Sequence, residues 1–280
     1  MQFLKKSATP DAAKAALKAI IDSPFLLFCA AVIDILFFVA LGGILGFFSE
    51  RILYYVTHAG NLVSSYSQGL SAADSPASVI DLLSNAGAMP SAQQAAWLTL
   101  GLFAALFSAY CLFQGTAWFL ASRMGNNRNK QAVHWAGFIR EFAVITLPWF
   151  ALFIIYNAII IWIDYSGFLP ETITRFAVLM IFFCIAFYFV MPAYASIGIC
   201  EQRSLVKRAF RIGIRKAGYF LPAYLLIIAA VIAINIFLAL VQTASSTLLL
   251  AGGALIFIPF MTWTRVFIEA VFERANKRFK

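Results

Sequence analysis

The chain has 280 residues, of which 62% are hydrophobic and only 12% are charged, and its formal net charge is +9. Soluble globular proteins carry about 25% charged residues, so this composition excludes an ordinary soluble domain. The Lys and Arg residues lie in short segments between long apolar runs. That distribution favours membrane topology and contact with anionic lipid, and it argues against nucleic acid as a partner.

The N-terminal segment, residues 1–23, is predicted to form an amphipathic helix at the membrane surface. Thr9 followed by Pro10 is typical of a helix start, with a capping hydroxyl before a proline at the first helical position. Apolar side chains then recur at helical spacing on a face opposite Lys14 and Lys18, namely Ala13, Ala16, Leu17, Ile20 and Ile21. A helix with such a division is expected to lie in the plane of the bilayer.

Six apolar segments follow, each long enough to cross about 30 Å of hydrocarbon as a helix. They are predicted near residues 25–48, 95–122, 142–164, 173–199, 218–241 and 247–268. In lipid, backbone polar groups must bond within the segment, which requires helices. The predicted fold is therefore all-α: one polytopic membrane domain, residues 1–280, with six transmembrane helices and interfacial amphipathic helices on the cytoplasmic side.

The basic residues predict the orientation of the chain. Of its 21 Lys and Arg residues, 19 lie in the N-terminal segment, in two connectors (123–140 and 200–217) and in the C-terminal part from Arg265. Only Arg51 and Arg175 lie in the alternate connectors. Because basic loops stay inside, a multi-pass protein of the cell membrane with both termini cytoplasmic is predicted. Residues 269–280 are predicted to form a basic C-terminal tail.

Residues 49–94 are predicted to be the one long external connection. Its beginning is expected to prolong the first transmembrane helix, and a short helix is expected to start at Asp74-Ser75-Pro76. Ser91 and Gln94 have the spacing of a capping box, which would open the second span.

The connector after the fourth apolar run, residues 200–217, contains six Lys or Arg residues against one Glu. A helix from Ser204 would place four basic side chains on one face, namely Lys207, Arg208, Arg211 and Arg215. The other face would be apolar, with Leu205, Val206, Ala209, Phe210, Gly213 and Ile214. We predict that this helix lies in the bilayer plane and binds anionic membrane lipid or a protein partner through its charges. The alternative is a solvated loop that only sets the orientation.

The passage MPAYASIGICEQRSLVKRAFRIGIRKAGYFLPAYLLIIAAVIAINI, residues 191–236, resembles a class of prokaryotic and archaeal six-helix membrane domains of unknown function. The membrane domain associated with bacterial glycerophosphodiester phosphodiesterases is similar. In these domains a span ends in small residues, a basic amphipathic connector follows, and the chain re-enters the membrane. The resemblance implies architecture only, because a phosphodiesterase catalytic domain is not recognisable in this sequence.

Few residues have the pattern of a catalytic or metal-binding site. His58 and His134 each lack a second ligand or a carboxylate at metal-binding spacing. The four cysteines are isolated and are interpreted as small packing residues, namely Cys29, Cys111, Cys184 and Cys200. Neither a phosphate-binding glycine loop nor an HExxH motif occurs. We therefore expect no enzymatic activity, no cofactor and no metal site.

Asp34 is the principal ionisable residue inside an apolar run. An unpaired carboxylate near the bilayer midplane costs at least about 2.5–3.5 kcal/mol, so Asp34 must face the bundle and needs a partner. Gln114 lies at a similar depth in the second span and is the predicted partner. Arg265 is expected nearer the interface, so the carboxyl is expected to be neutral and to link two helices. The alternative is a proton or cation site, which requires access for water. By the same depth argument, Asn157 and Asn235 are predicted to pair in the outer half.

The sequence leaves two functions open. One is a non-catalytic membrane component that binds lipid or a protein partner through its basic cytoplasmic residues. The alternative is a small transporter or channel for an apolar or amphipathic molecule. Transporters usually have several ionisable groups along their path or paired broken helices. Because Asp34 is nearly alone inside the apolar runs, the sequence favours the first function.

Overall fold

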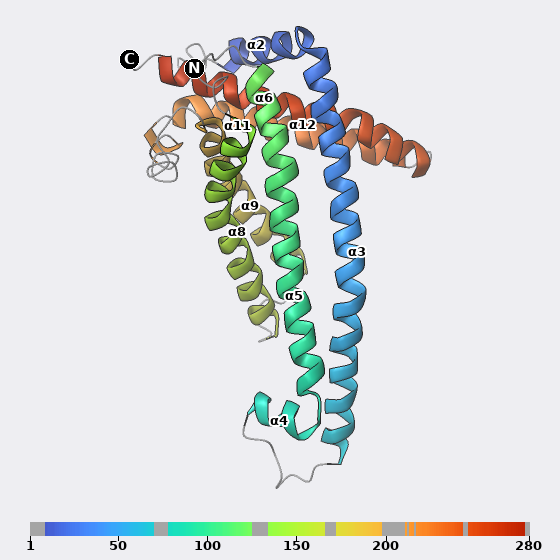
Figure 1. Ribbon diagram of the computed structural model, residues 1–280. Helices are drawn as coiled ribbons and strands as arrows, with labels where there is room; N and C mark the ends of the chain where they lie inside the picture. The colour runs from blue at the N-terminus through green and yellow to red at the C-terminus, as the bar shows by residue number, and fades with distance from the viewer. Residues whose placement is uncertain are drawn as a thin grey trace. The chain divides into compact units, whose positions relative to one another are not determined.

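The computed structural model describes residues 9–69, 78–124, 134–165, 172–197, 211, 213–215, 217–242 and 246–277. The regular elements in these ranges are all helical, which confirms the all-α class. In chain order they are α2 (Thr9–Ile21), α3 (Pro24–Gln68), α4 (Val79–Asn85), α5 (Met89–Ala109), the π-helical turn η1 (Tyr110–Gln114), α6 (Gly115–Met124), α8 (Trp135–Tyr165), α9 (Thr172–Ala195), α11 (Ala217–Gln242) and α12 (Ser246–Lys277) (Figure 1).

Five helices of the described chain are long and apolar enough to cross a membrane: Pro24–Gln68, Met89–Met124, Trp135–Ile160, Ala217–Leu240 and Leu255–Ala275. This number supports a multi-pass membrane protein. The predicted fourth span coincides with α9, within which the shorter apolar helix Cys184–Ala195 is found. The count of six spans therefore stays a prediction.

The chain divides into two compact units. The first contains the residues up to Ile35 and those from Cys111 onward, and the second contains Leu36–Tyr110. In the first unit α12 packs against α2, α6, α9 and α11, and α8 packs against α6 and α9. In the most apolar window of Leu255–Ala275, 56% of the residues are buried, against 11% in each of the other four candidate spans. Thus α12 is the central helix of the first unit.

Aromatic side chains fill the core between α6, α8 and α9. Phe142 of α8 is fully buried, and its ring stacks on that of Tyr194 of α9, with 4.2 Å between centroids. The Tyr194 hydroxyl lies 2.9 Å from Oγ1 of Thr146, and Trp118 of α6 meets the Tyr194 ring edge-on. A Cβ atom on Gly115 of α6 would lie 2.8 Å from Cδ1 of Ile139 and 3.2 Å from Cδ1 of Phe142, so this glycine marks a close approach of α6 to α8.

The second unit contains the rest of α3, together with α4 and α5. A Cβ atom on Gly101 of α5 would lie 3.1 Å from Cε1 of Phe48 on α3, so this glycine marks a close approach of the two helices. The predicted prolongation of α3 into the external connection is present as far as Gln68. The short helix is α4, capped by the Ser78 side chain, whereas its predicted start at 74–76 lies outside the described residues.

Two predicted element boundaries were wrong. The N-cap of α5 is Ala88, which makes no side-chain capping bond, so the predicted capping box does not open this helix. Residues 269–277, predicted to belong to a basic tail, are the last part of α12. Val271, Phe272 and Ala275 are buried there, because one side of the helix continues to pack beyond the apolar run.

Candidate functional site

Asp34, Gln114 and Arg265 form a buried polar cluster in the first unit. Their exposed fractions are 0%, 5% and 3%. Arg265 donates from Nη1 to Oδ2 of Asp34 at 2.8 Å and from Nη2 to Oδ1 at 2.7 Å. The Nη2 group also donates to Oε1 of Gln114 at 2.7 Å, and Nε2 of Gln114 lies 3.4 Å from Oδ1 of Asp34. The cluster therefore links α3, η1 and α12.

From the sequence, Asp34 was predicted to contact Gln114, but its contact with Arg265 was not predicted. The last span was predicted at 247–268, which put Arg265 near its end. The helix α12 instead runs from Ser246 to Lys277, so Arg265 lies well inside it rather than near its end. Because the Arg265 guanidinium donates to both carboxyl oxygens of Asp34, the expectation that Asp34 lacks a cationic partner was wrong. The arrangement is a bidentate ion pair, which is the strongest common hydrogen-bond geometry between side chains.

The π-helical turn η1 places Gln114 at this ion pair. A π-helical turn holds more residues than an α-helical turn, which changes the direction of the side chains that follow it, and such turns are frequent at functional sites. Gln114 is the last residue of the turn and is buried, as is Cys111. The turn thus places a neutral amide where it can accept from Arg265 and donate to Asp34 at the same time.

Asn157 and Asn235 do not pair with each other. Nδ2 of Asn157 donates to the carbonyl of Phe153 at 2.7 Å, and Nδ2 of Asn235 donates to the carbonyl of Val231 at 2.9 Å. Each amide therefore bonds to the backbone one turn earlier in its own helix, which satisfies it without a partner on another helix.

Of the predicted basic face, the structure describes Arg211 and Arg215, and both are exposed. Lys207 and Arg208 lie outside the described residues. Gly213, between the two arginines, is buried. Its carbonyl accepts a 2.8 Å hydrogen bond from the Tyr188 hydroxyl, and a Cβ atom at this position would lie 2.9 Å from Cδ1 of Phe189. Glycine therefore allows this part of the connector to pack against α9 while both arginines stay accessible.

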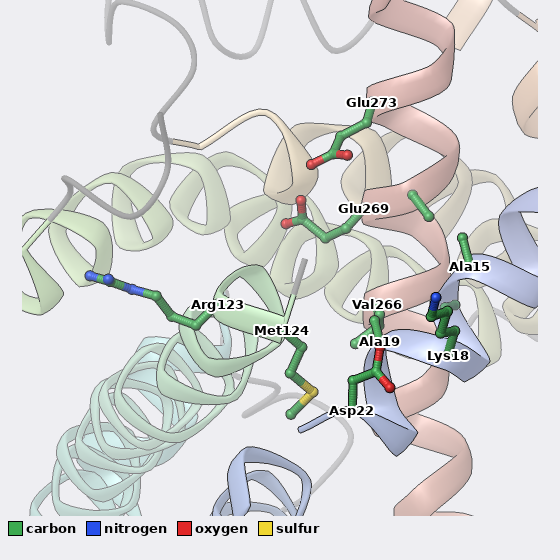
Figure 2. Close-up of a pocket in the computed structure, with 11 residues that line it drawn as sticks. Ala15, Lys18, Ala19, Asp22, Arg123, Met124, Val266, Glu269 and Glu273 are labelled. Carbon is green, nitrogen blue, oxygen red and sulfur yellow. The ribbon is translucent and has the colours of Figure 1, made fainter. Parts of the chain in front are cut away.

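A cavity of about 530 Å³ lies between α2, α6 and α12. Figure 2 shows the carboxyl groups of Glu269 and Glu273 on one side of α12, with Lys18 and Asp22 on the α2 side and Arg123 pointing away from both glutamates. Alanines of α2 complete the wall, namely Ala15, Ala16 and Ala19. The sequence did not predict this cavity, because its two glutamates lie in the segment predicted to be a tail. The only available signal was their spacing of four residues, which puts both on one face of a helix.

Among the residues that the structure describes, no group of three or more His, Cys, Asp or Glu residues is placed to hold a metal ion. Comparisons with protein-family models, with curated proteins and with solved structures found no match to this chain.

Proposed function

We propose that this chain is a non-catalytic protein of the cell membrane that binds anionic lipid through its basic connector, residues 200–217, on the cytoplasmic side. One observation carries the proposal: Arg211 and Arg215 are exposed on either side of the buried Gly213. Gly213 is thus held against α9, while Arg211 and Arg215 remain available. The distribution of Lys and Arg in the chain supports a cytoplasmic position for this connector.

An exposed apolar residue beside the arginines supports lipid as the partner. Ile214 is 66% exposed, although Gly213 next to it is packed against α9. At the surface of a bilayer, an isoleucine enters the acyl boundary, while arginines extend along it and place their guanidinium groups among the head groups. Anionic head groups attract each such cation by about 1 kcal/mol.

The buried ion pair supports a structural role for the intramembrane polar residues. Ionisable residues inside a membrane often mark an ion or substrate path, and such a role would require Asp34 or Arg265 to reach a polar cavity. Both are instead buried, and each oxygen of Asp34 accepts a hydrogen bond from Arg265. The cluster therefore favours a fixed link between helices over the alternative function, a transporter or channel.

Replacing Arg211 and Arg215 by glutamine is expected to weaken the preference of the protein for anionic lipid. Each charge contributes about 1 kcal/mol near an anionic surface, so each substitution should lower the preference about fivefold. The preference is measured by comparing how strongly spin-labelled phosphatidylglycerol and spin-labelled phosphatidylcholine associate with the full-length protein in vesicles. Raising the salt concentration should reduce the difference between parent and variant, because salt screens charges at the surface.

Arg51→Gln is the matched control, because Arg51 is an exposed arginine on the predicted external side. It should leave the lipid preference unchanged in vesicles with anionic lipid only in the leaflet that faces the connector. If the preference for anionic lipid is unchanged when both connector arginines are replaced, lipid binding by these residues is contradicted. Their charges would then bind a protein partner or only set the orientation of the chain.

A further inference from the structure

We propose that α2 and the first turns of α3 form an anchor that enters the cytoplasmic leaflet at the boundary between head groups and acyl chains. The proposal rests on the orientation in the proposed function, but it concerns a different surface and a different interaction. The anchor residues are four exposed apolar side chains, Leu17, Ile21, Phe25 and Phe28.

Contacts with α12 determine which side of α2 is buried and which side is exposed. Thr9, Ala12 and Ala16 are buried, and α2 packs against α12. Nη1 of Arg274 lies 3.2 Å from Oδ2 of Asp11, and Nη2 donates to the Asp11 carbonyl at 2.9 Å. The sequence had placed Ala16 and Leu17 on one apolar face. In the structure the alanine packs within the protein, and Leu17 remains outside.

The anchor residues follow one another at intervals of four, four and three residues. They are 54%, 67%, 74% and 66% exposed in chain order, from Leu17 to Phe28. Large apolar side chains exposed in such a series indicate a surface that is covered by a partner or by a membrane. Since α2 packs against α12 by its other side, it can present Leu17 and Ile21 without losing its contacts in the protein.

Continuity with a membrane span identifies lipid as the partner of this surface. Phe25 and Phe28 belong to the candidate span Pro24–Gln68, and only 11% of its most apolar window is buried in the protein. Figure 1 shows α2 lying across the N-terminal end of α3, where the candidate span begins. Lys14 and Lys18 are exposed on α2, and lysines beside apolar residues complement an anionic leaflet.

Nitroxide labels on the full-length, cysteine-free protein test the anchor. The labels are attached to Leu17→Cys and Ile21→Cys in vesicles of phosphatidylcholine and phosphatidylglycerol. Collision rates with oxygen, which concentrates in the acyl region, and with a water-soluble nickel chelate report the depth of each label. Ala15→Cys is the control on the side of α2 that lines the cavity between α2, α6 and α12, and Ile35→Cys is the control within α3. The ratio of oxygen to nickel collisions at residues 17 and 21 should exceed that at residue 15 by at least about threefold.

The controls separate failure of the anchor from failure of the proposed function. If the nickel chelate reaches residues 17 and 21 as readily as residue 15 while residue 35 is still in lipid, the anchor proposal is wrong. The proposed function as a membrane protein would not be affected. Exclusion of both reagents from residues 17 and 21 would also overturn the anchor, because protein would then cover the surface. Nickel access at residue 35 would contradict the membrane position of α3, and with it the proposed function.

Discussion

Replacing Asp34 by leucine is expected to lower the free energy of unfolding by about 3–5 kcal/mol, because the change leaves the buried guanidinium of Arg265 without its counterion. Arg265 is 3% exposed and makes two hydrogen bonds to Asp34, so little water can compensate for the loss. Gln114 would remain as a neutral acceptor for one donor. Reversible unfolding of the protein in mixed detergent micelles measures the change.

Two further variants distinguish an ion pair from a neutral carboxyl. Asp34→Asn keeps a side chain that can hydrogen-bond but removes the charge, so it should destabilise nearly as much as Asp34→Leu. The double variant Asp34→Leu with Arg265→Leu removes both charges and should recover most of the lost stability. If Asp34→Asn were as stable as the parent while Asp34→Leu was not, the carboxyl would act as a neutral link.

Replacing Phe142 by alanine is the second change with a large expected effect. Phe142 is fully buried between α6 and α9, where it stacks on Tyr194 and lies against Gly115. Removing a buried phenyl group leaves a cavity and forfeits its packing contacts, which typically costs about 3–5 kcal/mol. The same unfolding measurement should show this loss.

Val144→Ala is the matched control, because Val144 lies on the same helix and is 54% exposed. Its loss should be no more than about 0.5 kcal/mol, as is usual for changes outside the packed core. Comparable losses for the two variants would mean that α8 presents a different face to α6 and α9.

Composition and apolar run length were enough to predict the long apolar helices. Depth alone brought Asp34 next to Gln114, because a buried carboxylate must find a polar partner at its own level. The same reasoning failed for Arg265, which was predicted to lie nearer the interface but contacts Asp34. Glu269 and Arg274 interrupt the apolar run, yet Glu269 is 3% exposed and Arg274 pairs with Asp11 of α2. Tertiary contacts of this kind do not appear in the hydropathy of one segment.

The faces of the surface helices were harder to predict than their existence. From the sequence, the apolar residues of α2 were predicted to form one face toward the membrane. In the structure some of them are buried and others are exposed. Alanine is apolar enough to count toward such a face and small enough to pack between helices, so sequence periodicity cannot separate these two roles. Gly213 is a similar case, because its lack of a side chain matters only where Phe189 approaches it.

The side of the membrane on which the basic residues lie tests the account most directly, since lipid binding and the anchor both require the cytoplasmic side. Ser65 and Ala136 are exposed residues on the two sides predicted from the sequence. Each is replaced by cysteine in the cysteine-free protein and labelled in intact cells with a membrane-impermeant maleimide. Ser65→Cys should react from outside, and Ala136→Cys should react only after permeabilisation. Reaction of Ala136→Cys in intact cells, with Ser65→Cys protected, would invert the orientation and contradict the account.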